Sequence, residues 1–225
     1  MPHHLGHAEG AHGSIPADVI AQLQRIKHYI VENEKTARAF IKLMAPEVQQ
    51  RELYMDILDK RTDPLDVPYF LDPVFEGLDV GLISEAGVPC VADPGAQVVN
   101  IAHRKGVQVV PMVGPSSILM ALMASGMQGQ QFVFKGYLPH NSGERKKAVM
   151  QMERASDNGQ TQIFMETPYR NNQLLGDLKT WLRPSTKLCV ATDITQPTEF
   201  IKTLEIKDWA RESIDLHKRP TIFIV

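Results

Sequence analysis

Short apolar runs alternate with segments of helical length along most of the chain, and this alternation limits the possible folds more than any other feature. The runs of strand length are "HYIV" at 28–31, "DVGLI" at 79–83, "VQVVP" at 107–111, "QFVFKGY" at 131–137, "TQIFME" at 161–166 and "KLCVATDI" at 187–194. Strands that alternate with helices form parallel sheets with helices on both faces. The pattern predicts an α/β protein with mixed, mostly parallel sheets.

The segments between these runs carry helix signals. Residues 32–44 place Ala37, Phe40, Ile41 and Met44 on one face of a helix. Another helix is expected after an N-cap at Ser14, and a third from 63 onward. After residue 194 the rhythm changes, since "EFIKTLEI" at 199–206 and "TIFIV" at 221–225 have little helix between them. We expect the second sheet to end in antiparallel strands.

Two α/β domains follow from this order, with residues 1–113 in the first and 114–225 in the second. The formal net charge is -2, so a nucleic-acid partner would need a local basic patch. Cys90 and Cys189 lie far apart without zinc-site spacing, which favours a reduced, cytoplasmic setting. The apolar stretch from Ile118 is too short to span a membrane, so no membrane partner is expected. The histidines His3, His4, His7 and His12 match known metal-ligand patterns poorly and are more typical of a flexible leader, so we assign no metal.

Two glycine loops point to a ligand. In open α/β sheets, ligands bind beyond the carboxyl ends of the strands, where loops run into helix N-termini. "ISEAGVPCVADPG" at 83–95 and "VVPMVGPSS" at 109–117 both have this form. In the first loop Asp93 is expected either to cap the following helix or to contact the ligand. No phosphate-loop or dinucleotide fingerprint is present in the sequence.

These two loops, together with "FKGYLP", "FMETPYR" and "RPTIFIV", resemble the tetrapyrrole-methylase superfamily of S-adenosylmethionine-dependent methyltransferases. Within it they are most similar to the branch that 2'-O-methylates a cytidine ribose in small-subunit ribosomal RNA. The resemblance runs from about Leu5 to Val225. It implies two α/β domains with the cofactor in a cleft between them, a homodimer, and ribosomal RNA or the small ribosomal subunit as substrate.

The resemblance also implies site residues. The residues expected to contact S-adenosylmethionine are Asp93, Ala96, Ser116, Ser117, Ile118, Met165, Ala191 and Pro220. Family members usually begin with a strand that runs into an acid-containing loop, whereas this chain starts at that loop and has His7 at the acid position. We therefore expect the first strand to be missing. The resemblance likewise leads us to expect that the C-terminal extension found in many members of the ribosomal branch is missing.

A basic patch is the expected RNA contact. Arg145, Lys146 and Lys147 open a helix after "GYLPHNS", and Arg170 ends "FMETPYR". A solvated helix face is the common alternative for such a run. Methyl transfer from a sulfonium is an in-line displacement that positioning alone accelerates. The ribose hydroxyl must lose its proton, and Glu32, Glu34, Glu85 and Glu166 are candidate bases that the sequence does not distinguish, so no catalytic residue is assigned.

Two other functions stay open. A corrinoid-type small-molecule C-methyltransferase shares the implied fold, although "SEAGVPCVADPG" and "FMETPYR" favour the RNA branch. A cofactor-binding protein without turnover is the third interpretation.

Overall fold

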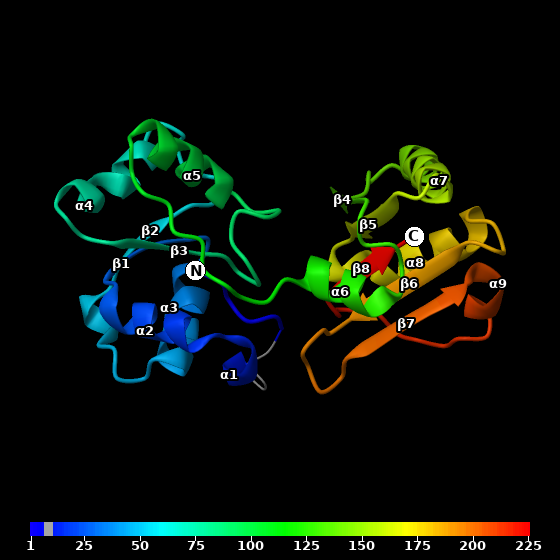
Figure 1. Ribbon diagram of the computed structural model, residues 1–225, viewed down its shortest axis with the longest axis horizontal. Coiled ribbons are helices and arrows are strands. Elements are labelled where there is room, and N and C mark those ends of the chain that lie inside the picture. The colour runs from blue at the N-terminus through cyan, green and yellow to red at the C-terminus, as the bar shows by residue number, and fades with distance from the viewer. Residues whose placement is uncertain (7–10) are drawn as a thin grey trace. The chain divides into compact units, whose positions relative to one another are not determined.

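The computed structural model describes residues 1–6 and 11–225, and these form two units, Met1–Ser116 and Ser117–Val225. The boundary lies three residues beyond the one expected from the sequence. Each unit has its own sheet and its own core (Figure 1). His7, at the position where the family pattern expects an acid, lies outside the described residues.

The sheet of the first unit has three parallel strands in the order β2-β1-β3. They are β1 (His28–Val31), β2 (Tyr54–Ile57) and β3 (Val80–Ile83). Successive residues of a strand face opposite sides of the sheet. Tyr29 and Val31 accordingly pack in the same cluster as α2 (Ala17–Arg25) and α3 (Glu34–Met44). Ile30 packs instead with α5 (Gly95–Arg104) and the 3-10 helix η2 (Val67–Leu71), so helices cover both faces of the sheet (Figure 1).

Helix α3 confirms the predicted apolar face, because Ala37, Phe40, Ile41 and Met44 are all buried. Asn33 begins this helix, and its Oδ1 accepts hydrogen bonds from the backbone N–H groups of Lys35 and Thr36. The remaining short helices of the first unit are α1 (Ala11–Ser14), η1 (Gln50–Glu52) and α4 (Asp72–Phe75).

The second unit has a five-stranded sheet in the order β4-β5-β8-β6-β7. The strands are β4 (Phe132–Tyr137), β5 (Thr161–Met165), β6 (Lys187–Thr192), β7 (Phe200–Glu205) and β8 (Thr221–Ile224). Only β4 and β5 pair in parallel, and the other pairs are antiparallel. The antiparallel ending is confirmed, and it extends further into the sheet than the sequence suggested.

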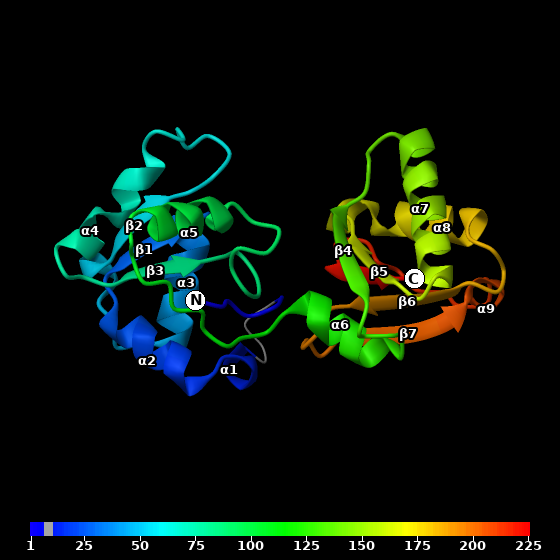
Figure 2. The same ribbon diagram turned by 45° about the horizontal axis from the view of Figure 1, so that its top comes forward.

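Helices cover this second sheet as well. Helix α6 (Ser117–Ser125) contacts β6, β7 and β8, while α7 (Ser142–Asp157) contacts β5 and α8 (Asn171–Trp181) (Figure 2). The short helices η3 (Pro168–Arg170) and α9 (Ile206–Trp209) complete the unit. No helix among residues 1–6 and 11–225 is both long and apolar enough to cross a lipid bilayer.

Three local predictions were wrong. Residues 107–111 are not a strand: within the described chain no neighbouring strand supplies a hydrogen-bonding ladder for them, and Val110 is exposed. The helix expected from residue 63 is broken into turns, η2 and α4, in a segment that contains Pro68 and Pro73. Ser14 ends α1, and α2 begins at Ala17 after Pro16 without a side-chain cap.

Candidate functional site

The loop after β3 is built in close contact with two other segments of the first unit. The backbone of His3 exchanges hydrogen bonds with Gly87, with His3 N–H to Gly87 O at 2.8 Å and Gly87 N–H to His3 O at 3.1 Å. Gly87 has a φ of 67°, and a Cβ at this residue would lie 3.1 Å from the carbonyl oxygen of Pro115. Glycine is therefore required where the segments 1–5, 84–95 and 112–116 approach each other.

Asp93 holds this loop in shape. Its two carboxylate oxygens accept hydrogen bonds from the backbone N–H groups of Cys90 and Gly95, each at 2.7 Å. Cys90 and Ala92 have φ values of 70° and 64°, a left-handed backbone that costs a non-glycine residue about 1–3 kcal/mol. The Asp93 hydrogen bonds offset part of that strain. Asp93 lies one residue before Pro94, the N-cap of α5, and it bonds the first N–H of that helix while it closes the loop.

Carboxylates gather at the carboxyl end of this sheet. Glu32 follows β1, and its Oε1 accepts a hydrogen bond from the backbone N–H of Glu85 at 3.4 Å. Burial raises the pKa of Glu32, and the charges of Asp93 and Glu85 raise it further, against the lowering effect of the Glu85 hydrogen bond. Such a cluster favours a positively charged ligand. Glu34 does not join it, because its carboxylate pairs with Arg38 on α3.

The cavity enclosed by these loops is small. It measures about 10 Å³ and is lined by Val31, Glu32, Leu58, Ser84, Asp93 and Gly95, among others. This is about the space of one water molecule. A nucleoside-sized ligand would therefore lie on the outer surface of the loops. Of the other predicted cofactor contacts in this unit, Ala96 is exposed on the first turn of α5, and Ser116 is half-buried.

In the second unit, three predicted cofactor contacts come together around β8. Met165 on β5 and Ala191 on β6 both pair with Ile222, one from each side. The carbonyl oxygen of Pro220, just before β8, accepts hydrogen bonds from the Asp193 N–H and the Thr192 hydroxyl. Met165 is half-buried, Ala191 is fully buried and Pro220 is exposed. Ser117 and Ile118 are half-buried at the start of α6, a helix that contacts β8 and β6.

The predicted contacts thus fall on both units, and the prediction of a cofactor cleft between the two domains stays a prediction. Asp93, Ala96 and Ser116 belong to the first unit, and the remaining predicted residues belong to the second.

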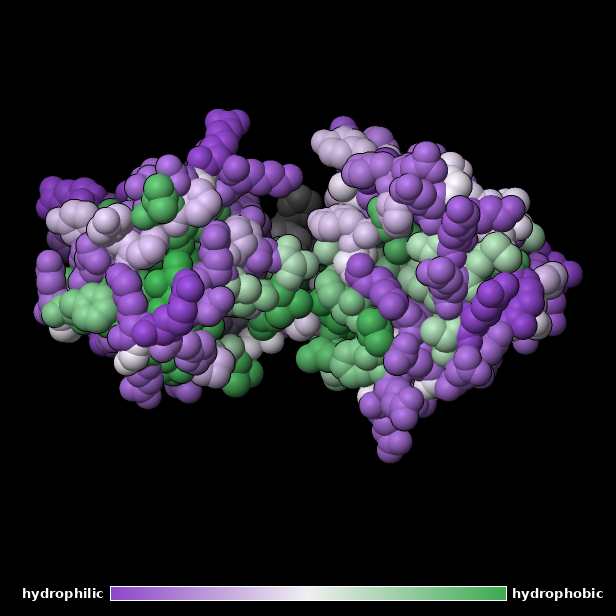
Figure 3. Space-filling model, turned by 90° about the horizontal axis from the view of Figure 1, so that it is seen from above, coloured by the Kyte–Doolittle hydropathy of each residue, from purple (hydrophilic) through white to green (hydrophobic). Residues whose placement is uncertain are grey.

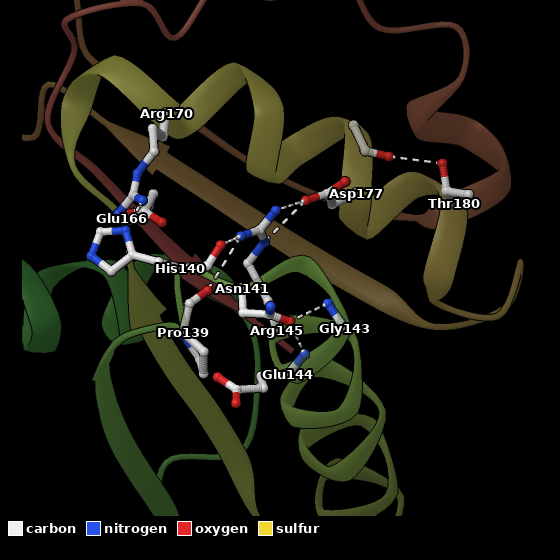
Figure 4. A network of polar contacts seen from close by, with 11 residues as sticks. Pro139, His140, Asn141, Gly143, Glu144, Arg145, Glu166, Arg170, Asp177 and Thr180 are labelled. Carbon is white, nitrogen blue, oxygen red and sulfur yellow. Dashed lines mark hydrogen bonds and ion pairs between the residues drawn. The ribbon is translucent and has the colours of Figure 1, made fainter.

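A network of polar side chains follows β4 and β5 (Figure 4). Glu166 has a side chain only 2% exposed, and its Oε1 accepts hydrogen bonds from the Thr167 N–H and from Arg170 at 2.7 and 2.6 Å. The guanidinium of Arg170 also contacts the His140 ring. Arg170 is thereby held in place by a buried carboxylate while part of its side chain stays exposed.

Arg145 has a different environment from the one expected of a phosphate contact. Its side chain is 5% exposed, and it donates two hydrogen bonds to Asp177 Oδ2 and one each to the carbonyl oxygens of Pro139 and His140 (Figure 4). This guanidinium joins α7, α8 and the loop after β4, and it offers no open face to RNA. Lys146 and Lys147 are exposed in the same helix.

The sequence interpretation missed the surroundings of Tyr169. This tyrosine is 69% exposed; the Lys218 ammonium lies 5.9 Å from its ring centre, and the His217 ring meets it edge-on. The run "HKR" at 217–219 was the available signal, but it lies far along the chain from "FMETPYR". Exposed aromatic rings beside cations are typical of surfaces that bind single-stranded nucleic acid.

Comparisons with known proteins agree with this architecture. The chain is 32% identical over 158 residues to the Ribosomal RNA small subunit methyltransferase I of Vibrio cholerae serotype O1, covering 69% of this chain and 54% of that protein. It is 37% identical over 124 residues to the protein of the same name from Neisseria meningitidis serogroup B, covering 55% of this chain and 41% of that protein. The chain thus spans about half the length of the curated relatives it matches.

The fold is found in a solved structure. The crystal structure of the methyltransferase CobJ superposes with a TM-score of 0.63 at 19% sequence identity, covering 95% of this chain and 88% of that one. The predicted α/β fold of two sheets is confirmed. The sequence profile described as Tetrapyrrole (Corrin/Porphyrin) Methylases matches residues 17–210, and with this match spanning both units the chain belongs to the tetrapyrrole methylase family.

Proposed function

We propose that this chain is an S-adenosylmethionine-dependent methyltransferase that 2'-O-methylates a ribose in small-subunit ribosomal RNA. The observation that carries the proposal is the similarity to curated relatives named for small-subunit ribosomal RNA methylation, which in one case extends over 69% of this chain. The likeness to CobJ supports the fold and does not select a corrinoid substrate.

The first unit suits a sulfonium nucleoside chemically. Glycine and proline in the loop 84–95 expose backbone groups at close range, and the carboxylates of Glu32 and Glu85 favour a cation. When bound, S-adenosylmethionine supplies an electrophilic methyl group. In this proposal Asp93 acts by holding the loop, because both of its oxygens are already bonded to backbone N–H groups. The proposed contacts beyond it are Ala96, Ser116, Ser117, Ile118, Met165, Ala191 and Pro220.

The second unit offers the RNA contacts. Lys146 and Lys147 are exposed, Arg170 is oriented by Glu166, and Tyr169 presents an open ring beside Lys218. We propose that these side chains bind phosphates and stack on bases, which positions the ribose hydroxyl. Of the four candidate carboxylates, Glu34 and Glu166 are engaged by arginines. Glu32 and Glu85 are therefore the candidates left to accept the hydroxyl proton.

We also propose a homodimer, and a cytoplasmic location that follows from the ribosomal substrate. On the second unit, hydrophobic side chains gather on the side where α6 lies (Figure 3). Leu119 and Met123 of this helix are 49% and 82% exposed. Large exposed apolar side chains on one helix are typical of an interface.

The test is methylation of small ribosomal subunits from a strain that lacks the corresponding gene. With labelled S-adenosylmethionine, we expect one 2'-O-methylated ribose, located by mass spectrometric mapping of the RNA. Methyl transfer to a corrinoid precursor and not to RNA would replace the proposal with the small-molecule alternative. Calorimetry without any cofactor binding would refute both.

A further inference from the structure

The first unit has a second cavity at the opposite end of its sheet from the loop 84–95. It has a volume of about 620 Å³ and opens where the parallel strands begin. Because β1, β2 and β3 run in the same direction, the residues that precede them meet at one edge. The cavity is lined by Arg25 to His28 before and at the start of β1, by Arg51, Glu52 and Tyr54 before and at the start of β2, and by Gly77 to Asp79 before β3. The volume is sufficient for a small organic ligand.

One wall of this cavity is aromatic. His28 and Tyr54 are register partners on β1 and β2, and their rings stack with centres 4.8 Å apart and planes 10° from parallel. Tyr54 is 65% exposed, so the stacked pair still has an open side. Bases of any sequence stack on such a ring because every base has an aromatic face.

The rim carries three cationic side chains. Arg25 pairs with Asp79, and Lys27 pairs with Glu52 at 3.0 Å, both as exposed ion pairs. Arg51 is exposed and has no ion pair or hydrogen bond within the described part of the chain. Exposed pairs contribute little to stability, so Arg25 and Lys27 can exchange their carboxylate partners for a phosphate at small cost. Arg51 can bind an anion without first breaking an ion pair.

We propose that this cavity binds one nucleotide of single-stranded RNA, with the base stacked on Tyr54 and the phosphate bound by Arg51 and Lys27. The combination of a flat open ring and neighbouring cations selects a planar, anionic ligand. A free mononucleotide carries the same base and phosphate, and competition with cytidine monophosphate distinguishes it from a nucleotide within RNA. The inference rests on the proposed RNA substrate and adds a second contact, distinct from the surface around Tyr169 and Lys146.

The experiment measures binding of a fluorescein-labelled ten-nucleotide oligocytidylate to the full chain by fluorescence anisotropy. Tyr54→Ala should raise the Kd about tenfold, since one lost base stack is within the usual range for alanine substitution. Tyr54→Phe should bind as the wild type does. Tyr69→Ala is the matched control, because Tyr69 is 66% exposed and lies outside the cavity. It should leave the Kd unchanged.

The cationic contact has its own readout. Arg51→Ala should reduce the slope of log Kd against log salt by about 0.7, the value for one phosphate of single-stranded RNA. Arg154→Ala, an exposed arginine on α7, should leave the slope unchanged. Unlabelled cytidine monophosphate should compete only weakly, since it lacks the neighbouring phosphates.

Each remaining outcome would overturn either the RNA assignment of the cavity or the proposed function. If Tyr54→Ala and Arg51→Ala bind the oligonucleotide as their controls do while ribosomal subunits are still methylated, the cavity is not an RNA contact and the proposed function stands. Tight binding of the mononucleotide without the oligonucleotide would overturn the RNA assignment of the cavity. Failure of the wild type both to bind RNA and to methylate subunits would refute the proposed function and, with it, the inference.

Discussion

Replacing Arg145 should destabilise the second unit far more than its place in a run of basic residues suggests. Arg145→Met keeps most of the side-chain volume but removes the two hydrogen bonds to Asp177 and those to the carbonyl oxygens of Pro139 and His140. Breaking a buried ion pair costs about 3–5 kcal/mol because the remaining charge is left without a partner. Asp177 is still 22% exposed and can reach water, so we expect the lower end, about 3 kcal/mol.

The assay is thermal unfolding followed by circular dichroism. For a chain of this size each kcal/mol lowers the Tm by about 2–4 °C, so Arg145→Met should melt about 6–12 °C below the wild type. Lys146→Met, on the exposed side of the same helix, is the control and should lie within about 0.5 kcal/mol of the wild type. If the two variants melt within about 1 °C of each other, the buried network does not stabilise the unit and our reasoning is refuted.

Four further predictions concern the proposed site. Asp93→Ala should weaken S-adenosylmethionine binding about tenfold, or by roughly 1.4 kcal/mol, because the loop loses its two carboxylate bonds; calorimetry showing equal affinity in a folded variant would remove Asp93 from the site. Burial raises the pKa of Glu32, so ionisation of this carboxyl lowers the free energy of unfolding. This loss of stability is absent below the ordinary pKa of 4.5, and it is complete once the pH has risen through the raised pKa. Glu32→Gln should therefore melt higher than the wild type at pH 7 but not at pH 4, and a constant difference in Tm would contradict this. The double variant Lys146→Ala, Lys147→Ala should weaken RNA binding and leave cofactor affinity unchanged. The slope of log Kd against log salt should fall by about 0.7 for each lost phosphate contact. An unaltered slope would mean that the two lysines are only a solvated helix face. Sedimentation should give a dimer at micromolar concentration, and a monomer would count against the role of the apolar α6 surface.

The sequence predicts an element well where burial leaves a continuous apolar signal. Strands β5, β6 and β8 are almost fully buried and read as apolar runs. Strand β2 was missed because it lies at a sheet edge, with Tyr54 and Ile57 exposed and Asp56 in its middle. Residues 107–111 show the opposite error, since an apolar run does not form a strand without a partner beside it.

The site was predictable only where its parts are local. The glycine loops could be read directly, because a tight turn needs glycine wherever it occurs. The role of Arg145 could not be predicted from the sequence, because its partner Asp177 lies 32 residues away and only the packing of α7 on α8 brings them together. A charge run looks the same in sequence whether its members face water or a buried carboxylate.

The central position of β8 has a consequence for how the chain is made. This strand is the last of the second unit to be synthesised, yet it lies between β5 and β6, which do not pair with each other. During synthesis the second sheet therefore stays in two halves until β8 leaves the ribosome, while every strand of the first sheet is already available. Such late, non-local pairing is slow, and it leaves the edges of β5 and β6 open to wrong partners. The first unit should thus fold earlier during synthesis than the second, whose sheet is complete only once β8 can pair.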